Sequence, residues 1–136
     1  MEAAAMRGIL TVMTLIFFVS TILSCAINEK KLKETGAELL SQQELVEIFS
    51  QNRVVNLSSG SSSVEGHYFT DGTQKIVWPG GLDMGKYEIR NGQFCSQWTI
   101  TRAGKEECYR IYYTAGDEYI WVKPNGSFDS KMIIIK

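Results

Sequence analysis

The chain has 136 residues, of which 14 are basic and 15 acidic, with one His and three Cys. This length suits a single domain of ordinary size. A formal net charge of -1 lacks the broad positive field that nucleic-acid binding requires, so we expect no nucleic-acid partner. One His and three Cys are too few for a His-rich metal centre or a structural zinc site, and we expect no metal ion and no cofactor.

The N-terminus has the pattern of an export signal. Arg7 precedes an almost wholly apolar run, residues 9–23, and a small residue follows it. The sequence Ile22-Leu23-Ser24-Cys25 resembles the lipobox of bacterial lipoproteins, in which the Cys becomes the lipidated first residue of the mature chain. We therefore expect residues 1–24 to be a lipoprotein signal peptide and Cys25 to be the lipidation site.

Two alternatives stay open for this segment. Residues 8–28 carry no charge, and a bilayer span needs roughly 20 apolar residues, so an uncleaved anchor helix is one of them. A secreted form is the other. On the favoured interpretation the chain binds the membrane through its lipidated N-terminus and faces the periplasm. Ala26 favours the outer membrane over the inner one, because it is not the Asp that often retains lipoproteins at the inner membrane.

The mature chain divides into a tether, residues 25–38, and one β-barrel-like domain, residues 39–136. The tether includes a charged stretch, residues 28–34, that has little apolar surface to bury. We expect it to act as a solvated spacer between the membrane and the domain.

One short helix is predicted at the start of the domain. Ser41 and Glu44 have the spacing of a capping box, in which each side chain accepts a hydrogen bond from the other residue's backbone N–H. Leu45, Ile48 and Phe49 then follow at helical spacing, which predicts a helix over residues 42–51. A helix this short is marginal alone, so its apolar face must dock on the rest of the domain.

From residue 53 onward, short alternating segments and tight turns predict a mainly β fold. Turn signals such as Asp71-Gly72 and Asn91-Gly92 favour hairpins between neighbouring strands. The residues from Met132 to Ile135 are too apolar for a bare edge strand, so the last strand should pair with the first and close the sheet. We expect an antiparallel meander of about eight strands, closed or nearly closed into a barrel: residues 53–57, 64–70, 74–78, 86–90, 93–101, 107–114, 118–123 and 131–135.

The longest predicted hairpin carries two cysteines. Cys95 and Cys108 both fall on the more polar face of their strands, opposite Phe94 and Trp98. If Cys25 is lipidated, these two remain as an even pair in an exported protein, which predicts a disulfide between them. Trp98 is expected to be buried inside the barrel.

Three tryptophans are the main candidates for binding. Trp78, Trp98 and Trp121 are possible ligand-facing aromatics, which would either line a pocket in the barrel or fill its interior. We favour the filled interior, because eight-stranded barrels are just wide enough for side chains to pack them solid. His67 lies within a predicted strand with no nucleophile at an informative spacing, so we predict no catalytic residue.

Several motifs occur in an order that resembles a family of small exported proteobacterial proteins known only as a domain of unknown function. The resemblance covers residues 39–126 and implies the same fold, export and paired cysteines, but no catalytic residues. Tyr87 departs from the pattern, because the family usually has Trp there. The motifs are Tyr68-Phe69-Thr70-Asp71-Gly72-Thr73, Gly85-Lys86-Tyr87-Glu88-Ile89, Asn91-Gly92-Gln93-Phe94-Cys95-Ser96-Gln97-Trp98 and Glu107-Cys108-Tyr109-Arg110-Ile111-Tyr112.

These observations favour a lipid-anchored, non-enzymatic envelope protein that acts as a binding or structural module, with an unknown protein partner as one possibility. An inhibitor of an exported hydrolase such as lysozyme is the main alternative, although the chain has no loop motif typical of such inhibitors. Two further alternatives are small-ligand binding in an aromatic barrel pocket and a hydrolase that acts through His67.

Overall fold

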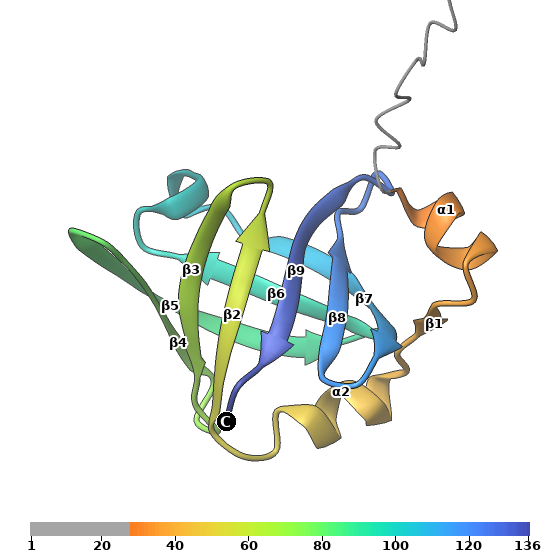
Figure 1. The fold of residues 1–136 in the computed structure, drawn as a ribbon. Helices are drawn as coiled ribbons and strands as arrows, with labels where there is room; N and C mark the ends of the chain where they lie inside the picture. The colour runs from red at the N-terminus through yellow and green to blue at the C-terminus, as the bar shows by residue number, and fades with distance from the viewer. Residues whose placement is uncertain (1–27) are drawn as a thin grey trace, which may run out of the picture.

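The computed structural model of the chain describes residues 28–136 (Figure 1). The predicted signal peptide, residues 1–24, and the predicted lipidation site, Cys25, lie outside the described residues.

The described chain contains two α-helices, nine strands and one 3-10 helix, η1. In chain order they are α1 (Glu29–Glu34), β1 (Glu38–Leu39), α2 (Gln42–Ile48), β2 (Arg53–Ser59), β3 (Ser62–Tyr68), β4 (Thr73–Trp78), β5 (Gly81–Arg90), β6 (Gln93–Trp98), η1 (Thr101–Gly104), β7 (Glu107–Ala115), β8 (Glu118–Val122) and β9 (Phe128–Ile134).

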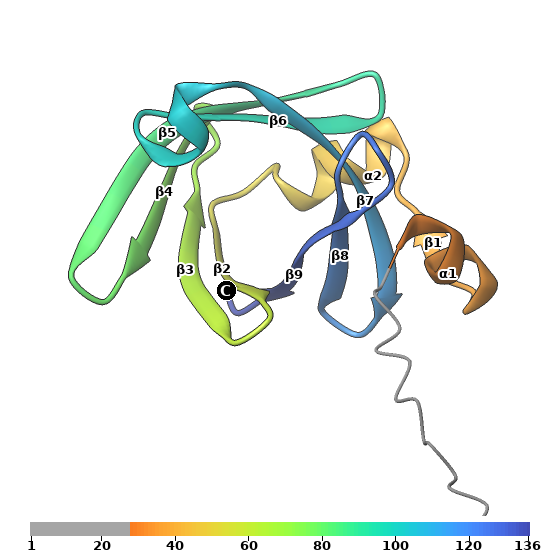
Figure 2. The same cartoon turned by 90° about the horizontal axis from the view of Figure 1, so that it is seen from above.

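Strands β2 to β9 form a closed antiparallel barrel, as the sequence predicts. Each strand pairs with the next one along the chain, and β9 also pairs with β2, where Leu57 lies opposite Met132. The ring is visible in both views (Figures 1 and 2). Strand β1 is an addition that pairs with β7 at Tyr112 and Tyr113, beyond the residues of β7 that pair with β6. The predicted closure by the last and first strands is therefore confirmed.

The barrel has two different ends, because hairpin turns between successive antiparallel strands fall alternately at one end and the other. The β2–β3, β4–β5, β6–β7 and β8–β9 connections lie at one end, called here the mouth end (Figure 1). The β3–β4, β5–β6 and β7–β8 turns lie at the other, called here the helix end, where α2 packs (Figure 1).

Helix α2 covers the helix end. The Ser41–Glu44 capping box is present: Ser41 Oγ accepts from the Glu44 backbone N–H at 3.2 Å, and Glu44 Oε2 accepts from the Ser41 N–H at 2.7 Å. Leu45 and Phe49 are buried in the main core, and Ile48 packs against it. The helix ends at Ile48, earlier than predicted, since Phe49 is its C-cap.

Aromatic side chains form the centre of the core near α2. Phe94 is fully buried, and its ring centroid lies 4.8 Å from that of Phe49 and 4.8 Å from that of Trp121. Tyr68 meets Phe94 edge to face at 5.4 Å, and Tyr87 stacks on it at 4.9 Å. This half of the barrel is filled, as expected for so narrow a ring.

Two segments between predicted strands are strand instead. Residues 58–63, which separate the predicted strands 53–57 and 64–70, mostly extend β2 and β3, and Gly60 at φ 59° makes the tight turn between them. Gly85, which precedes the predicted strand 86–90, lies inside β5 opposite Trp98. A Cβ at this position would lie 2.3 Å from the Gln97 carbonyl oxygen and 3.0 Å from the Trp98 ring. Glycine is required there because the Gln97 carbonyl oxygen and Trp98 occupy the space that a Cβ would need.

The predicted tether is not a free spacer from residue 28 onward. Leu32 of α1 is buried in a small second core with Tyr112, Ile120 and Val122. The carboxylate of Glu29 makes a two-pronged ion pair with the Arg110 guanidinium, at 2.7 and 2.8 Å, and accepts from the Tyr112 hydroxyl at 2.6 Å. Leu32 and the Glu29–Arg110 ion pair thus dock α1 on the barrel, although the composition of this segment predicts a solvated spacer.

The docking of α1 should weaken in acid. Hydrogen bonding to Arg110 lowers the pKa of Glu29 from 4.5 to about 2, against the opposing effect of burial. Because the folded pKa is the lower one, the stabilisation is complete above about pH 4.5 and is lost as the pH falls toward 2. We expect the protection of the α1 amides against hydrogen exchange, measured relative to the unfolded chain at the same pH, to fall over this range.

The matched variants are Glu29→Gln and Glu34→Gln. Glu29→Gln should lower the protection of α1 above about pH 4.5 and abolish its acid dependence. Glu34 lies on the same helix and has no ion pair within residues 28–136, so Glu34→Gln should behave as the native chain does. If the protection of α1 changes neither with pH nor with Glu29→Gln, the Glu29–Arg110 ion pair does not dock this helix.

Candidate binding cavity

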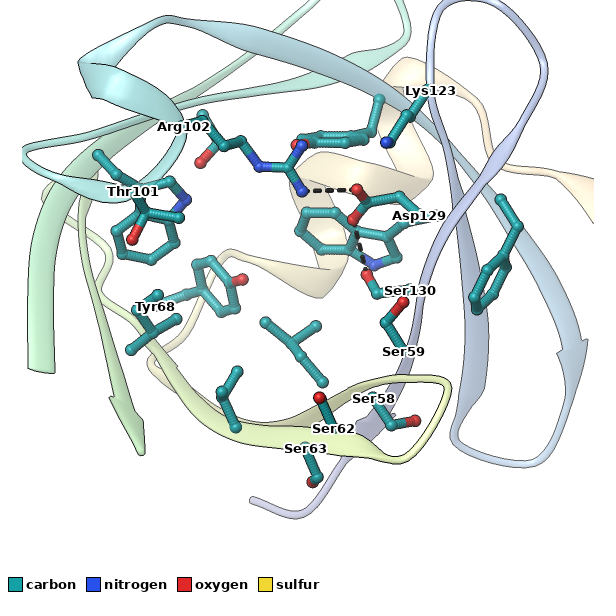
Figure 3. Close-up of a pocket in the computed structure, with 18 residues that line it drawn as sticks. Ser58, Ser59, Ser62, Ser63, Tyr68, Thr101, Arg102, Lys123, Asp129 and Ser130 are labelled. Atoms are coloured by element: carbon teal, nitrogen blue, oxygen red, sulfur yellow. Dashed lines mark hydrogen bonds and ion pairs between the residues drawn. The ribbon is translucent and has the colours of Figure 1, made fainter. Parts of the chain in front are cut away.

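The mouth half of the barrel contains a cavity of about 440 Å³ that opens at the mouth end (Figure 3). The prediction of a solid interior is therefore correct for the helix end and wrong for the mouth end. The physical reason is the placement of the large rings: Phe49, Tyr87 and Phe94 gather beside α2, while the mouth-end turns carry small residues.

The inner wall of the cavity is mostly aromatic and aliphatic. Burial raises the pKa values of the Tyr68 and Tyr109 hydroxyls, so both stay protonated near neutral pH. Trp121 Nε1 is buried and has no hydrogen-bond partner within the described residues. The inner wall consists of Leu57, Val64, Tyr68, Ile76, Trp98, Tyr109 and Trp121.

The rim of the cavity is polar. Four serines of the β2–β3 hairpin lie on one side, and Thr101, Arg102, Lys123, Asp129 and Ser130 lie on the others (Figure 3). The four serines are Ser58, Ser59, Ser62 and Ser63. A cavity with apolar inner walls and a rim of hydroxyl and charged groups suits a molecule with one apolar and one polar end.

The side chain of Arg102 lies at the rim, over the ring of Tyr109 from the inner wall. Its guanidinium pairs with Asp129 at 2.5 Å and also with Glu107, and it lies 5.3 Å from the centre of the Tyr109 ring (Figure 3). Burial acts to lower the pKa of Arg102, but the hydrogen bond and charge of Asp129 outweigh it and raise the pKa. Arg102 is thus a fixed cation in contact with an aromatic face.

The loop that carries Arg102 is held in an uncommon conformation. Arg102 and Ala103 both have φ of 55°, a left-handed geometry that costs roughly 1–2 kcal/mol for a residue with a side chain. The buried carboxylate of Asp83 holds the start of this loop by accepting from the backbone N–H groups of Ile100, at 3.1 Å, and Thr101, at 2.7 Å. Burial acts to raise the pKa of Asp83, but hydrogen bonds from Thr101, Ile100 and Met84 outweigh it and lower the pKa.

The three candidate tryptophans separate into two groups. Trp98 and Trp121 line the cavity and are buried, which confirms the predicted burial of Trp98. Trp78 is not among the lining residues and is exposed at the end of β4. The sequence did not predict Arg102, Lys123 and Asp129 as site residues, because they come together only when β7, β8 and β9 lie side by side.

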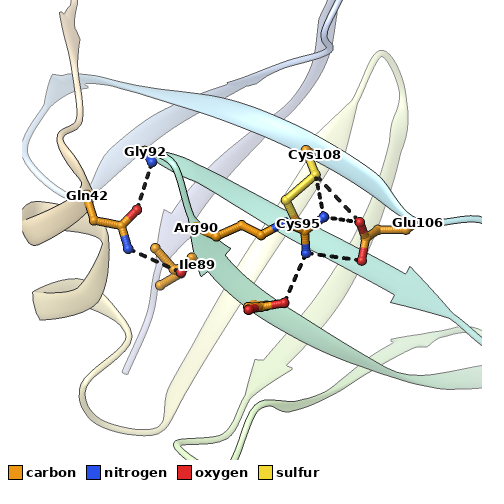
Figure 4. The surroundings of a disulfide bond; sticks show 8 residues. Gln42, Ile89, Arg90, Gly92, Cys95, Glu106 and Cys108 are labelled. Carbon is orange, nitrogen blue, oxygen red and sulfur yellow. Dashed lines mark hydrogen bonds and ion pairs between the residues drawn. A yellow bond between two sulfur atoms is a disulfide. The ribbon is translucent and has the colours of Figure 1, made fainter.

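The predicted cysteine pair comes together on β6 and β7. Cys95 and Cys108 lie directly opposite each other, and their sulfur atoms are 2.13 Å apart, at disulfide-bonding distance (Figure 4). Glu106 is close to both sulfurs, but thiols joined to each other are not available as metal ligands. Nearby, Gln42 of α2 accepts from the Gly92 N–H at 2.7 Å and thereby ties α2 to the β5–β6 turn (Figure 4).

His67 does not line the cavity. Its ring lies 2.6 Å from the Glu65 carboxylate, two residues earlier on the same strand. Both belong to β3, and His67 sits between Gly66 and Tyr68 of the inner face. The structure brings no hydroxyl nucleophile to this pair among the contacts of the described residues.

No family model matches this chain. No curated protein matches it, and no solved structure does. Within residues 28–136, no helix has the length and apolar character needed to cross a bilayer.

Proposed function

We propose that the chain is a lipid-anchored, non-enzymatic envelope protein that binds a small amphipathic molecule in the mouth of its barrel. The observation that carries this proposal is the cavity of about 440 Å³ with aromatic walls and a charged rim. The similarity to a family of exported proteins stays a prediction from the sequence, as does the alternative of a hydrolase inhibitor.

The size and lining of the cavity support a small ligand. Ligand sites commonly have volumes of roughly 300–1,000 Å³ and apolar walls with a few placed polar groups. The unpartnered Trp121 N–H supplies a donor that the protein itself leaves unsatisfied, and buried donors in proteins usually have partners. An acceptor on the ligand, or an ordered water, would satisfy it.

The charged groups at the rim favour a polar or anionic head group. Arg102 is neutralised by Glu107 and Asp129, whereas Lys123, which also lines the rim, has no ion pair among the described residues. A ligand with its apolar part against Trp98 and Trp121 would place its head near Lys123 and the serine hydroxyls. A fatty acid has this chemistry, and a fluorescent fatty acid serves as the test ligand.

The anchor and the absence of catalysis rest on the sequence. Cys25 in its lipobox context supports attachment to the membrane, and the lack of a nucleophile at an informative spacing from His67 in the sequence supports a binding role. Neither argument depends on the cavity.

The test uses the full chain in phospholipid nanodiscs and cis-parinaric acid, a fluorescent fatty acid excited by energy transfer from tryptophan. Trp98 and Trp121 line the cavity, so a bound probe should give a saturable signal at one site per chain. Ser130→Leu, which adds volume inside the cavity, should weaken binding at least tenfold. Ser61→Leu, at the β2–β3 turn and outside the lining set, should bind as the native chain does.

The absence of a saturable signal in the native chain would contradict the proposal. Equal signals from the native chain, Ser130→Leu and Ser61→Leu would also contradict it, because the probe would then be in the lipid and not in the cavity.

A further inference from the structure

The described chain enters the fold at the mouth end. The backbone N–H of Glu29 donates to the Gly126 carbonyl at 2.9 Å, and Asn28 bridges to Ser127, so the first described residues lie on the β8–β9 turn. Lys123 and Phe128, on either side of this turn, line the cavity. The Glu29–Arg110 ion pair fixes the entry point at this position.

Covalent geometry limits the distance between this entry point and the membrane. Three Cα–Cα steps separate Cys25 from Asn28, and together they span at most about 11 Å. If Cys25 is lipidated, the β8–β9 turn lies this close to the bilayer. An uncleaved anchor helix gives the same result, because the uncharged run ends at Asn28.

Three of the exposed apolar side chains lie at the mouth end. Trp78, Leu82 and Ile100 are 37%, 55% and 73% exposed. Trp78 and Leu82 flank the β4–β5 turn, which splays outward from the ring, and Ile100 begins the β6–β7 connection (Figure 1). Trp78 is the exposed member of the three tryptophans, and tryptophan favours the membrane–water interface.

The charge at this end also suits a lipid surface. Glu29 pairs with Arg110, whereas Glu107 and Asp129 share Arg102, so these three carboxylates and two guanidinium groups together leave one negative charge. Lys30, Lys105 and Lys123 add positive charge close to the same turns. A basic surface with apolar tips is attracted to anionic lipid and then buries its tips in the interface.

We propose that the mouth end of the barrel lies against the bilayer that anchors the chain, with Trp78, Leu82 and Ile100 in the interface, and that the cavity exchanges its ligand with that bilayer. This inference rests on the membrane anchoring and the binding cavity proposed above. On this inference the ligand is an amphiphile taken from the bilayer. Its apolar chain enters between the aromatic walls, and its head group stays among the rim residues.

The experiment measures depth from tryptophan emission. The full chain is reconstituted in vesicles of phosphatidylethanolamine and phosphatidylglycerol, with or without lipids brominated near the head group, which quench only tryptophans in the bilayer. Mass spectrometry of the N-terminal peptide first establishes how the chain is anchored. We expect quenching of the native chain and loss of most of it in Trp78→Phe, because Trp98 and Trp121 are buried.

A matched probe at the helix end controls for orientation. Val46 is exposed on α2, so Val46→Trp in the Trp78→Phe background carries an exposed tryptophan at the opposite end. It should not be quenched. Quenching of this probe, or no quenching of Trp78 in an anchored chain, would overturn the proposed orientation.

The failure of this inference is distinguishable from failure of the proposed function. A chain that binds cis-parinaric acid at one site but shows no quenching of Trp78 keeps its binding function and loses the orientation. Quenching of Trp78 without saturable probe binding supports the orientation and removes the ligand. If mass spectrometry finds neither a lipid on Cys25 nor an uncleaved anchor helix, both the proposed orientation and the proposed membrane anchoring are wrong.

Discussion

Replacing Phe94 with alanine is expected to lower the free energy of unfolding by about 3–5 kcal/mol, the usual cost of truncating a buried aromatic residue. Phe94 is fully buried at the centre of the filled half of the barrel. Its ring contacts those of Phe49, Tyr68, Tyr87 and Trp121. The cavity left behind would lie between α2 and the sheet, where the surrounding rings cannot easily collapse.

Chemical denaturation followed by circular dichroism measures this loss. Ile100→Ala is the control: Ile100 is 73% exposed, so its truncation should change the unfolding free energy by less than about 0.5 kcal/mol. If both variants unfold at the same denaturant concentration as the native chain, the filled core described around Phe94 is wrong.

Removing the disulfide by Cys95→Ala and Cys108→Ala is expected to cost about 3 kcal/mol, because the bond closes a short loop of the unfolded chain. The position of the bond adds to its importance. Strands β6 and β7 share only three register pairs, Phe94–Tyr109, Cys95–Cys108 and Ser96–Glu107. The disulfide is the middle pair of the shortest interstrand contact in the ring.

The bond can be tested with the native chain and the double variant under the same denaturation protocol, each with and without a reducing agent. Reductant should destabilise the native chain to about the level of the double variant and leave the double variant unchanged. A native chain indifferent to reductant, or two freely alkylated thiols in the oxidised protein, would contradict the pairing.

Local signals in the sequence were sufficient for most of the fold. Asn91-Gly92 is predicted as a hairpin turn, and both residues adopt the left-handed backbone that this turn requires, at φ of 53° and 72°. The capping box at Ser41 and Glu44 likewise depends on residues close in the chain. The closure between β2 and β9 was predictable for a different reason, since the apolar strand at the C-terminus needed a partner.

The errors share a physical origin in contacts between residues far apart in the chain. Gly85 falls just outside the predicted strand 86–90, but its place in β5 depends on the close approach of Gln97 and Trp98 of the neighbouring strand. Leu32 is one leucine in a charged stretch, and its burial depends on Tyr112 and Ile120. No local pattern in the sequence contains this information.

The cavity was not predictable from composition, because the same aromatic residues can fill a barrel or line it. The outcome depends on how the large rings divide along the barrel axis. Phe49, the C-cap of α2, packs against Tyr87 and Phe94 at the helix end. Trp121 contacts Phe94 in the core and also lines the cavity. Arg102 reaches Asp129 only after β7, β8 and β9 have assembled side by side.

The closure of the ring by β2 and β9 has a consequence for how the chain folds. All other barrel pairings join strands that follow one another, so they can form as local hairpins, whereas Val55 meets Ile134 only when the two ends of the domain come together. Loop closure over a long separation costs more conformational entropy, so this pairing should form last. Until it does, β2 and the apolar β9 each present an open edge, and that interval is when neighbouring copies of the chain are most able to aggregate.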